Sequence, residues 1–207
     1  MFYVIIRAIL RFVMRIAFRM QVEGKDNVPS QGGVILAANH LSMLDPIVVG
    51  CAIDRPVRFM GKRELFDNPF VGMIARGLGA FPVRRGKDDK DAFRRALELL
   101  RNDEVLGIFP EGTRSLDGRL QRAYSGAAVL AEKTSAYLVP VGIIGTGNVM
   151  RKGAVFPKVG RISVKFGKPI VPAEVCSMIP MNQPSFKPRE AITNLMMEEI
   201  ERLVMSF

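Results

Sequence analysis

The chain contains a single histidine, His40, and an aspartate follows it five positions later, at Asp45. Histidine is the side chain whose ordinary pKa lies nearest neutrality, so it can accept a proton and return it at working pH. A carboxylate partner can fix the tautomer of the imidazole and stabilise its protonated form. The pair therefore predicts general-base chemistry, provided that the two side chains meet.

Whether they meet depends on where the helix around them begins. Five residues along a regular helix amount to about 140° of rotation, so the two side chains would diverge if both residues were helical. We expect His40 to lie in a loop between an apolar strand over 33–38 and a helix that begins at Pro46. The alternative is purely structural: Asp45 before a proline suits a helix N-cap, and a lone histidine after a strand can be hydrogen-bonded structure.

A second segment with the composition of a site is Ile-Phe-Pro-Glu-Gly-Thr-Arg-Ser at 108–115. It follows an apolar run at 105–107, so its polar groups come at the C-terminal end of an expected strand, where open α/β sheets bind ligands. Glycine lets a backbone N–H approach a ligand closely, and arginine binds phosphate or carboxylate through a planar fork of donors. The alternative, a surface turn with solvated charges, explains less of the pattern.

Together the two segments resemble the glycerolipid acyltransferase family, which includes 1-acyl-glycerol-3-phosphate acyltransferase. Four blocks of that family occur in their usual order. They are Asn39 to Asp45, Gly61 to Phe66 with Gly79 to Gly86, Phe109 to Ser115, and Val139 to Gly142. The similarity covers roughly residues 27–170, and the histidine-aspartate pair combined with the Phe-Pro-Glu-Gly-Thr-Arg block is highly specific.

The resemblance implies transfer of a fatty acyl group from acyl carrier protein or coenzyme A to the free hydroxyl of 1-acyl-glycerol 3-phosphate (lysophosphatidic acid), giving phosphatidic acid. His40 would be the general base and Asp45 its partner. The thioester is a co-substrate, and neither a cofactor nor a metal is expected. No acyl-enzyme is expected either, because the chain lacks a Gly-x-Ser-x-Gly turn and neither Cys51 nor Cys176 has a plausible base beside it. Both thiols are expected to be buried or uninvolved.

The acceptor's phosphate requires cations from several parts of the chain. By resemblance, Lys62, Arg85 and Arg114 bind this phosphate, and Glu111 with Gly112 belongs to the same acceptor pocket. The arginine before Arg85 would point to the opposite face of a strand. The backbone around Gly112 is the first place to look for donors to the tetrahedral oxyanion. The alternative for each basic residue is a solvated surface charge.

Composition limits the partners. At 207 residues, of which 48% are hydrophobic, the chain can bury one core and is too short for two ordinary domains. Its net charge of +10 indicates an anionic partner, either a membrane surface, an acidic carrier protein or nucleic acid. Nucleic acid is disfavoured, because tryptophan is absent and no RNA-binding signature is recognisable. Two distant cysteines indicate neither a disulfide framework nor a metal site.

Residues 1–20 are almost entirely apolar between arginines at positions 7, 11, 15 and 19. On a helix the four guanidiniums occupy an arc of about 120°. This pattern predicts an amphipathic helix on an anionic membrane surface, whereas no apolar run exceeds six residues, too few to span. The alternative is a helix docked on the protein's own core. We expect an anchoring helix over 1–22, an acyltransferase domain over 23–207, and peripheral or monotopic attachment to the cytoplasmic face of the cell membrane.

The rest of the chain alternates between strand-like and helix-like runs, which predicts a single-domain α/β fold with a mostly parallel or mixed sheet flanked by helices. The expected strands are 33–38, 57–60, 80–83, 105–109, 138–144 and 161–166. The expected helices are 46–52, 69–78, 89–101, 126–134 and 188–205. The proline-rich segment 171–187 is expected to be a loop, after which the last helix packs back separately. Residues 148–159 show no clear pattern.

Two other functions fit the same residues. The nearer one is acyl transfer to glycerol 3-phosphate, a lysophospholipid or another hydroxylated lipid, because the motifs indicate the chemistry better than the acceptor. The farther one is a non-catalytic protein that binds anionic lipid through the basic helix. In that case, His40→Ala would leave every measured property unchanged.

Overall fold

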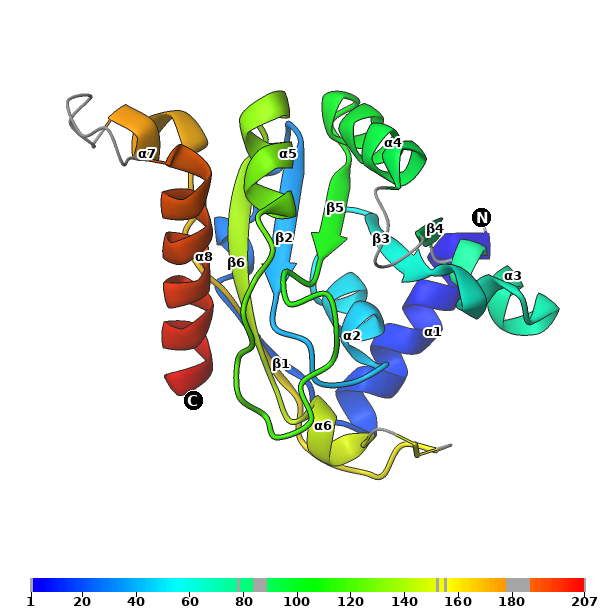
Figure 1. Cartoon of the computed structure of the whole chain (residues 1–207). Helices are drawn as coiled ribbons and strands as arrows, with labels where there is room; N and C mark the ends of the chain where they lie inside the picture. Colours follow the sequence, from blue (N-terminus) through cyan, green and yellow to red (C-terminus); the bar gives the residue numbers. More distant parts are fainter. Residues whose placement is uncertain are drawn as a thin grey trace.

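The computed structural model of the chain describes residues 2–77, 79–83, 89–151, 153–154, 156–177 and 187–206. These residues form one seven-stranded sheet with helices on both faces (Figure 1). The strands are β1 (Gln21–Glu23), β2 (Val34–Ala38), β3 (Val57–Lys62), β4 (Phe81–Val83), β5 (Val105–Ile108), β6 (Tyr137–Ile144) and β7 (Ser163–Phe166). The helices are α1 (Phe2–Ile16), α2 (Asp45–Ala52), α3 (Pro69–Gly77), α4 (Lys90–Arg101), α5 (Gly126–Thr134), α6 (Thr146–Val149), α7 (Pro172–Ser177) and α8 (Pro188–Met205), with short 3-10 turns η1 (Lys25–Asn27) and η2 (Arg63–Phe66).

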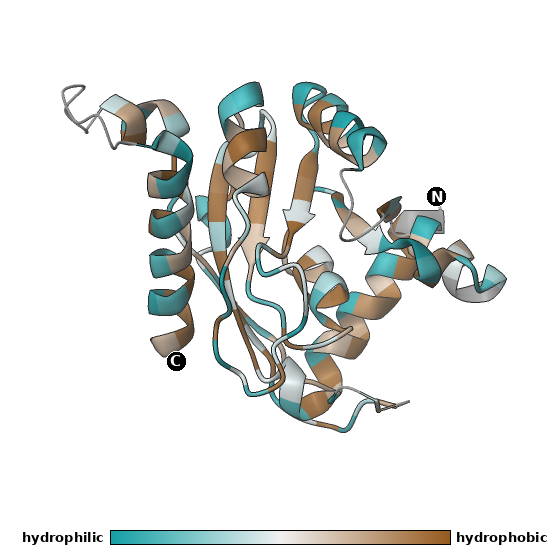
Figure 2. Ribbon diagram, viewed as in Figure 1, coloured by the Kyte–Doolittle hydropathy of each residue, from teal (hydrophilic) through white to brown (hydrophobic). Residues whose placement is uncertain are grey.

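The order of the strands across the sheet is β1-β7-β6-β2-β5-β3-β4. Neighbouring strands are parallel, except that β6 and β7 are antiparallel. Strand β2 lies between β5 and β6, and all five of its residues are buried. A strand covered on both faces needs apolar side chains throughout, and Figure 2 shows the central strands as hydrophobic. The predicted α/β fold with a mostly parallel sheet is confirmed.

Two hydrophobic cores cover the two faces of the sheet. Helices α1 and α2 pack on one face, with Met14 and Phe18 among the buried side chains. Helices α4, α5 and α8 pack on the other, with Leu100, Leu130 and Met196 buried among them. Because α8 belongs to this second core, the expectation that the last helix packs separately is wrong.

Helix α1 lies on the protein's own core and also exposes an apolar surface. It ends at Ile16, before the expected boundary at residue 22, and Met14 and Phe18 are only 2% and 5% exposed. Its outer side carries exposed large apolar side chains at Val4, Ile5, Ile9, Phe12, Val13 and Ile16. Hydrophobic residues on α1 are visible in Figure 2. The docked helix that the sequence offered as the alternative is therefore observed, and contact of its exposed side with a membrane stays a prediction.

Two of the four N-terminal arginines bind the end of α2. The guanidinium of Arg7 donates to the carbonyl of Ile53 at 3.0 Å, and Nε of Arg11 donates to the carbonyl of Cys51 at 2.8 Å. The last carbonyls of a helix lack intrahelical partners and carry partial negative charge, so cations there stabilise the helix end. The expectation that all four arginines face a membrane is wrong for this pair. Arg15 and Arg19 are exposed.

Several elements were missed. The expected loop over 171–187 contains α7, which begins at Pro172, a residue that the first turn of a helix tolerates; residues 178–186 lie outside the described part of the chain. Strand β1 and helix α6 contain three and four residues, too short for a periodic pattern. Within the described residues, no helix combines the length and apolarity needed to cross a membrane.

Candidate active site

The two residues expected to form the catalytic pair are in contact. His40 lies in the loop between β2 and α2, and Asp45 is the first residue of α2. Nδ1 of His40 lies 2.8 Å from Oδ2 of Asp45. The histidine is 7% exposed and the aspartate is fully buried. With Nδ1 turned toward Asp45, Nε2 is the ring nitrogen that an incoming hydroxyl can approach.

The carboxylate of Asp45 points back into this loop instead of capping α2. Its Oδ2 also accepts hydrogen bonds from the backbone N–H groups of Leu41 and Ser42, each at 2.7 Å. The N-cap residue of α2 is Leu44, which makes no side-chain cap bond. The expectation that Asp45 serves as the N-cap of α2 is therefore wrong. Three donors converge on one carboxylate oxygen, and together they fix where the imidazole lies.

The imidazole ring is also held from one side by an aromatic stack. Phe109, which follows β5, lies with its ring centroid 4.0 Å from that of His40 and its plane inclined by 18°. Phe59 of β3 lies 6.1 Å from Phe109. Gly107 of β5 leaves room for this stack, since a Cβ there would lie 2.1 Å from a ring atom of Phe59. Strands β3 and β5 thus position the plane of the imidazole.

The segment 109–115 forms hydrogen bonds with both the N–H and the carbonyl of His40. The N–H of His40 donates to Oε1 of Glu111 at 2.9 Å, and its carbonyl accepts from the N–H of Ser115 at 2.8 Å. The second oxygen of Glu111 accepts from the backbone N–H of Gln121 at 2.9 Å. Burial raises the pKa of Glu111, and the two backbone hydrogen bonds partly oppose that shift. The two segments singled out in the sequence are therefore joined directly, with the Glu111 carboxylate turned toward backbone.

Further polar side chains fix the same loop, and the sequence did not single them out for this. Asn39 exchanges two hydrogen bonds with the backbone of Ile143 in β6, donating at 2.9 Å and accepting at 2.7 Å. Ser42 donates from Oγ to the carbonyl of Met150, just after α6, at 2.9 Å. Their signal in the sequence is only that polar residues directly follow a buried strand, which does not reveal their partners.

The three basic residues expected at the acceptor's phosphate are placed differently. Arg114 is half-buried and precedes Ser115, whose N–H binds the histidine backbone, so its backbone lies close to His40. Lys62 ends β3, and its half-exposed side chain forms an ion pair of 3.2 Å with Glu64. Such an exposed ion pair contributes little free energy, so an anion could displace the glutamate. Arg85 lies outside the described residues.

The backbone at Gly112 is committed to a turn. Its φ of +68° lies in the left-handed region that favours glycine, and its N–H donates to the carbonyl of Phe109 at 2.9 Å. A Cβ at this position would lie 3.0 Å from the ring of Tyr124. The N–H of Gly112 itself is therefore engaged in the turn, and the backbone around Gly112 as a source of oxyanion donors stays a prediction.

Apolar hollows border the aromatic stack on two sides. A cavity of about 220 Å³ lies between α1, α2, β3 and α3, with Met43, Ile47 and Phe59 among its lining residues. A hollow of about 520 Å³ lies beside α4 and α5, and Phe109 and Tyr124 contribute to its wall. The two hollows therefore reach the aromatic stack that lies beside the imidazole, one at Phe59 and the other at Phe109.

Cys51 is unsuited to nucleophilic catalysis. It is buried inside α2, and this burial raises the pKa of its thiol to about 11, although Arg11 and Arg7 oppose the shift. The thiolate is the nucleophilic form of cysteine, and little of it exists at neutral pH when the pKa is this high. The expectation of a buried thiol is confirmed at this position.

Comparison with known proteins gives a consistent picture. Residues 19–144 match the family model described as Acyltransferase. The 1-acyl-sn-glycerol-3-phosphate acyltransferase of Bacillus subtilis is 30% identical over 94% of this chain and 92% of its own length. The chloroplastic 1-acyl-sn-glycerol-3-phosphate acyltransferase LPAT1 of Arabidopsis thaliana is 34% identical over 66% of this chain, which covers 39% of that protein. The crystal structure of the 1-acyl-sn-glycerophosphate acyltransferase PlsC from Thermotoga maritima has a TM-score of 0.77 at 26% identity, covering 99% of this chain and 81% of that one.

Proposed function

The chain belongs to the acyltransferase family, and from this premise we propose that it transfers a fatty acyl group from a thioester to the free hydroxyl of 1-acyl-glycerol 3-phosphate, giving phosphatidic acid. The observation that carries the proposal is the buried contact between His40 and Asp45, held by the 109–115 segment. Similarity to curated acyltransferases acting on this acceptor, over nearly the whole chain in one case, supports the choice of substrate.

In the proposed reaction, Nε2 of His40 removes the proton of the acceptor hydroxyl while its oxygen attacks the thioester carbonyl. The imidazolium that forms lies opposite the carboxylate of Asp45, which stabilises it. Collapse of the tetrahedral intermediate forms the ester and breaks the carbon–sulfur bond. The proton then returns from His40 to the departing thiolate, so the imidazole is neutral again after one turnover.

We assign the acceptor's phosphate to Arg114, Lys62 and Arg85. Arg114 is supported by its place beside the catalytic loop, whereas Lys62 and Arg85 rest on their positions in the family's motif. Lys62 would exchange its exposed ion pair with Glu64 for the phosphate. Lys62→Ala should therefore weaken use of phosphorylated acceptors. The apolar hollows beside the Phe59–Phe109 stack are suited to the acyl chains of the substrates.

We further propose that α1 holds the enzyme on the cytoplasmic face of the cell membrane. Its exposed apolar side chains, Ile9 and Phe12 among them, would enter the interfacial region. Arg15 and Arg19, both exposed, would bind anionic headgroups. Basic residues near an anionic leaflet contribute about 1 kcal/mol each, so the two arginines could contribute about 2 kcal/mol before apolar insertion is counted.

The decisive experiment is an assay of thiol release with purified protein, using acyl carrier protein and coenzyme A thioesters as donors and 1-acyl-glycerol 3-phosphate as acceptor. His40→Ala should lower kcat by roughly 10² to 10⁴ in a variant that still folds. Thiol release with glycerol 3-phosphate or another lysophospholipid, but not with 1-acyl-glycerol 3-phosphate, would assign a different acceptor. Lipid binding without thiol release from either donor would refute enzymatic function, and a folded His40→Ala variant with more than half of normal activity would remove this residue from the mechanism.

A further inference from the structure

A segment far from α1 in the sequence exposes the most accessible large hydrophobic side chains of the described residues. In the 150–162 segment, which joins α6 to β7, Phe156 and Val159 are 80% and 82% exposed. Burial of a side chain of this kind is stabilising, so leaving two in water within one short segment forgoes a substantial stabilisation. Such groups on a surface indicate an interaction site.

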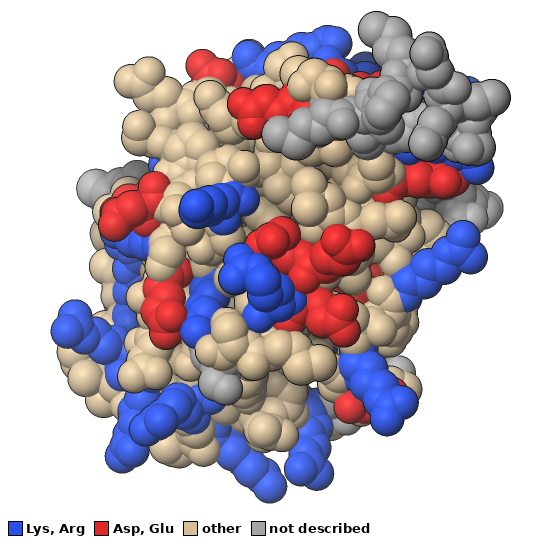
Figure 3. Space-filling model, turned by 90° about the vertical axis from the view of Figure 1, so that its left-hand side faces the viewer, with Lys and Arg blue, Asp and Glu red and all other residues tan. Residues whose placement is uncertain are grey.

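The charged residues that flank these two side chains in the sequence are of one sign. The sequence has no aspartate or glutamate between Glu132 and Glu174. Arg151, Lys158 and Arg161, all exposed, flank the two apolar residues. Figure 3 shows that lysine and arginine side chains gather along the lower edge of the molecule, where α6 and the 150–162 segment lie in Figure 1. A surface that combines inserted apolar groups with cations complements an anionic lipid leaflet.

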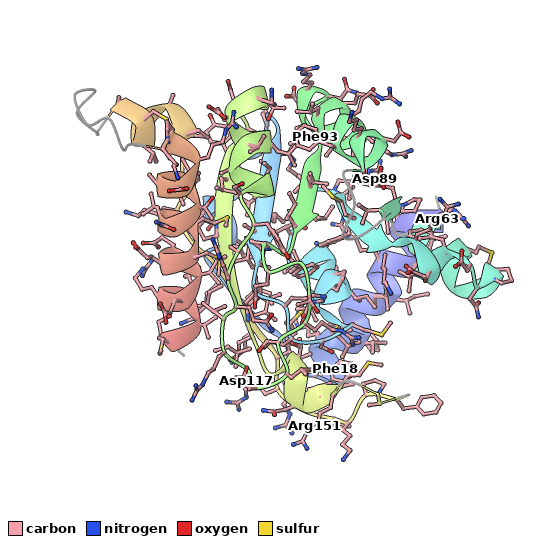
Figure 4. The ribbon with its side chains drawn as sticks, viewed as in Figure 1. Phe18, Arg63, Asp89, Phe93, Asp117 and Arg151 are labelled. Carbon is pink, nitrogen blue, oxygen red and sulfur yellow. The ribbon has the colours of Figure 1, made fainter. Side chains whose placement is uncertain are left out.

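Hydrogen bonds join one end of the segment to the loop between β2 and α2, which contains His40, and the other end to the residues that follow α1. The carbonyl of Met150 accepts the hydroxyl of Ser42, two residues after His40. The N–H of Ile162 donates to the carbonyl of Phe18 at 3.0 Å. Figure 4 shows Phe18 and Arg151 at the same lower edge of the structure. The segment therefore lies beside both the active site and the proposed membrane helix.

We propose that the 150–162 segment is a second membrane contact, in which Phe156 and Val159 enter an anionic leaflet while Arg151, Lys158 and Arg161 bind its headgroups. The proposal rests on the attachment through α1 proposed above. A leaflet is favoured over an acidic protein because it can meet exposed apolar groups on two separate elements at once. With two contacts, the protein cannot rotate on the membrane about the axis of α1. The loop that contains His40 therefore stays turned toward the leaflet from which the acceptor comes.

The absence of tryptophan from the chain provides a direct test. A Phe156→Trp variant carries one tryptophan, and its emission should shift to shorter wavelength on vesicles of phosphatidylglycerol and phosphatidylcholine and be quenched by brominated lipid. Met205→Trp is the matched control, since Met205 is 76% exposed at the end of α8 and should report no change. The shift at position 156 should weaken on pure phosphatidylcholine.

The outcomes separate this proposal from the attachment through α1. Unchanged emission at position 156 in protein that sediments with vesicles would overturn the second contact and leave the first intact. Failure of the protein to sediment would contradict attachment as a whole. A shift caused by acyl carrier protein but not by vesicles would overturn the leaflet as partner.

A loss-of-function variant tests the same surface without a probe. Phe156→Ser combined with Val159→Ser should weaken vesicle binding by roughly tenfold or more, because two apolar side chains no longer leave water. The ratio of activity on bilayer acceptor to activity on detergent-dispersed acceptor should fall in parallel. Met205→Ser should change neither quantity. Unchanged vesicle affinity of the double variant, with an unchanged melting temperature, would refute the proposal.

Discussion

Replacing Asp45 with asparagine would remove a charge from the site while preserving most of its hydrogen bonds. Oδ2 of Asp45 accepts from Nδ1 of His40 at 2.8 Å and from the N–H groups of Leu41 and Ser42 at 2.7 Å. The carbonyl oxygen of an asparagine can take this place, and its amide nitrogen would then occupy the position of Oδ1. The opposite orientation would direct an amide nitrogen at two backbone N–H groups, so it is disfavoured. The imidazole should therefore keep its place.

The size of the effect follows from the missing charge. In the proposed transition state, the imidazolium of His40 would face a neutral amide instead of a carboxylate. A hydrogen bond to a charged group contributes about 1.5–3 kcal/mol and a neutral one about 0.5–1.5 kcal/mol, so loss of the charge with the bond retained removes about 1–1.5 kcal/mol. Since about 1.4 kcal/mol is tenfold in rate, kcat/KM of Asp45→Asn should fall roughly 5- to 15-fold. This loss is smaller than the upper range expected for His40→Ala.

Initial rates of thiol release, measured over a range of acceptor concentrations, give the ratio directly. Asp91→Asn is the control, because Asp91 is an exposed carboxylate on α4 that should leave kcat/KM unchanged. Thermal unfolding of each variant shows whether the fold survives. A folded Asp45→Asn enzyme with more than half of the normal kcat/KM would refute a catalytic role for the charge. Loss of activity together with a large fall in melting temperature would instead assign Asp45 to loop folding.

Four further results are expected. Glu111→Gln leaves one of the two backbone N–H groups, of His40 or Gln121, facing an amide nitrogen. The free energy of unfolding should therefore fall by about 1–3 kcal/mol in denaturant titrations, and kcat should fall more than KM rises. Unaltered stability would contradict the structural role of these two hydrogen bonds. Arg114→Ala should remove about 1.5–3 kcal/mol of transition-state stabilisation, seen as a lower kcat/KM for the phosphorylated acceptor with donor saturation unchanged. A defect confined to the donor would assign Arg114 to the donor's binding site instead. Because burial raises the pKa of Cys51 to about 11, its thiol stays protonated at pH 8 and should react with a maleimide far more slowly than a free thiol. The reaction should become faster only as the pH approaches 11. Rapid labelling of Cys51 at pH 8, read by mass spectrometry, would refute its burial. Phe12→Ser should weaken sedimentation with anionic vesicles without lowering the melting temperature, a cleaner test than deleting residues 1–20, which would also remove Met14 and Phe18 from the core.

The central sheet could be predicted from the sequence because its strands are short apolar runs between clear breaks. The end of β2 and the start of α2 could be placed to within a residue, since Pro46 marks the first turn of the helix. The contact between His40 and Asp45 followed from that boundary. Elements of three to six residues, such as β1 and α7, contain too few residues for a period to be recognised.

The roles of individual charges were harder to predict, because they depend on partners distant in the sequence. Arg7 and Arg11 have the spacing expected of a membrane-facing stripe, yet they bind carbonyls at the end of α2, which are 46 and 40 residues away in the sequence. Glu111 belongs to a recognisable motif, but the pattern does not indicate that its oxygens accept from the backbone of His40 and Gln121. Hydropathy and spacing predict which face is polar, whereas the identity of a hydrogen-bond acceptor is a property of the folded chain.

The hydrogen bond from the N–H of Ser115 to the carbonyl of His40 has a consequence for the acceptors that the enzyme can use. Because this bond joins the residue after Arg114 to His40, the backbone limits how far the Arg114 guanidinium can lie from the imidazole. An acceptor whose phosphate binds Arg114, as proposed, would present its free hydroxyl at a distance set by the glycerol carbons. Acylation would then require that this hydroxyl reach Nε2 of His40. The backbone thereby serves as a molecular ruler, and a glycerol backbone lengthened by one carbon should be acylated poorly even if it binds well.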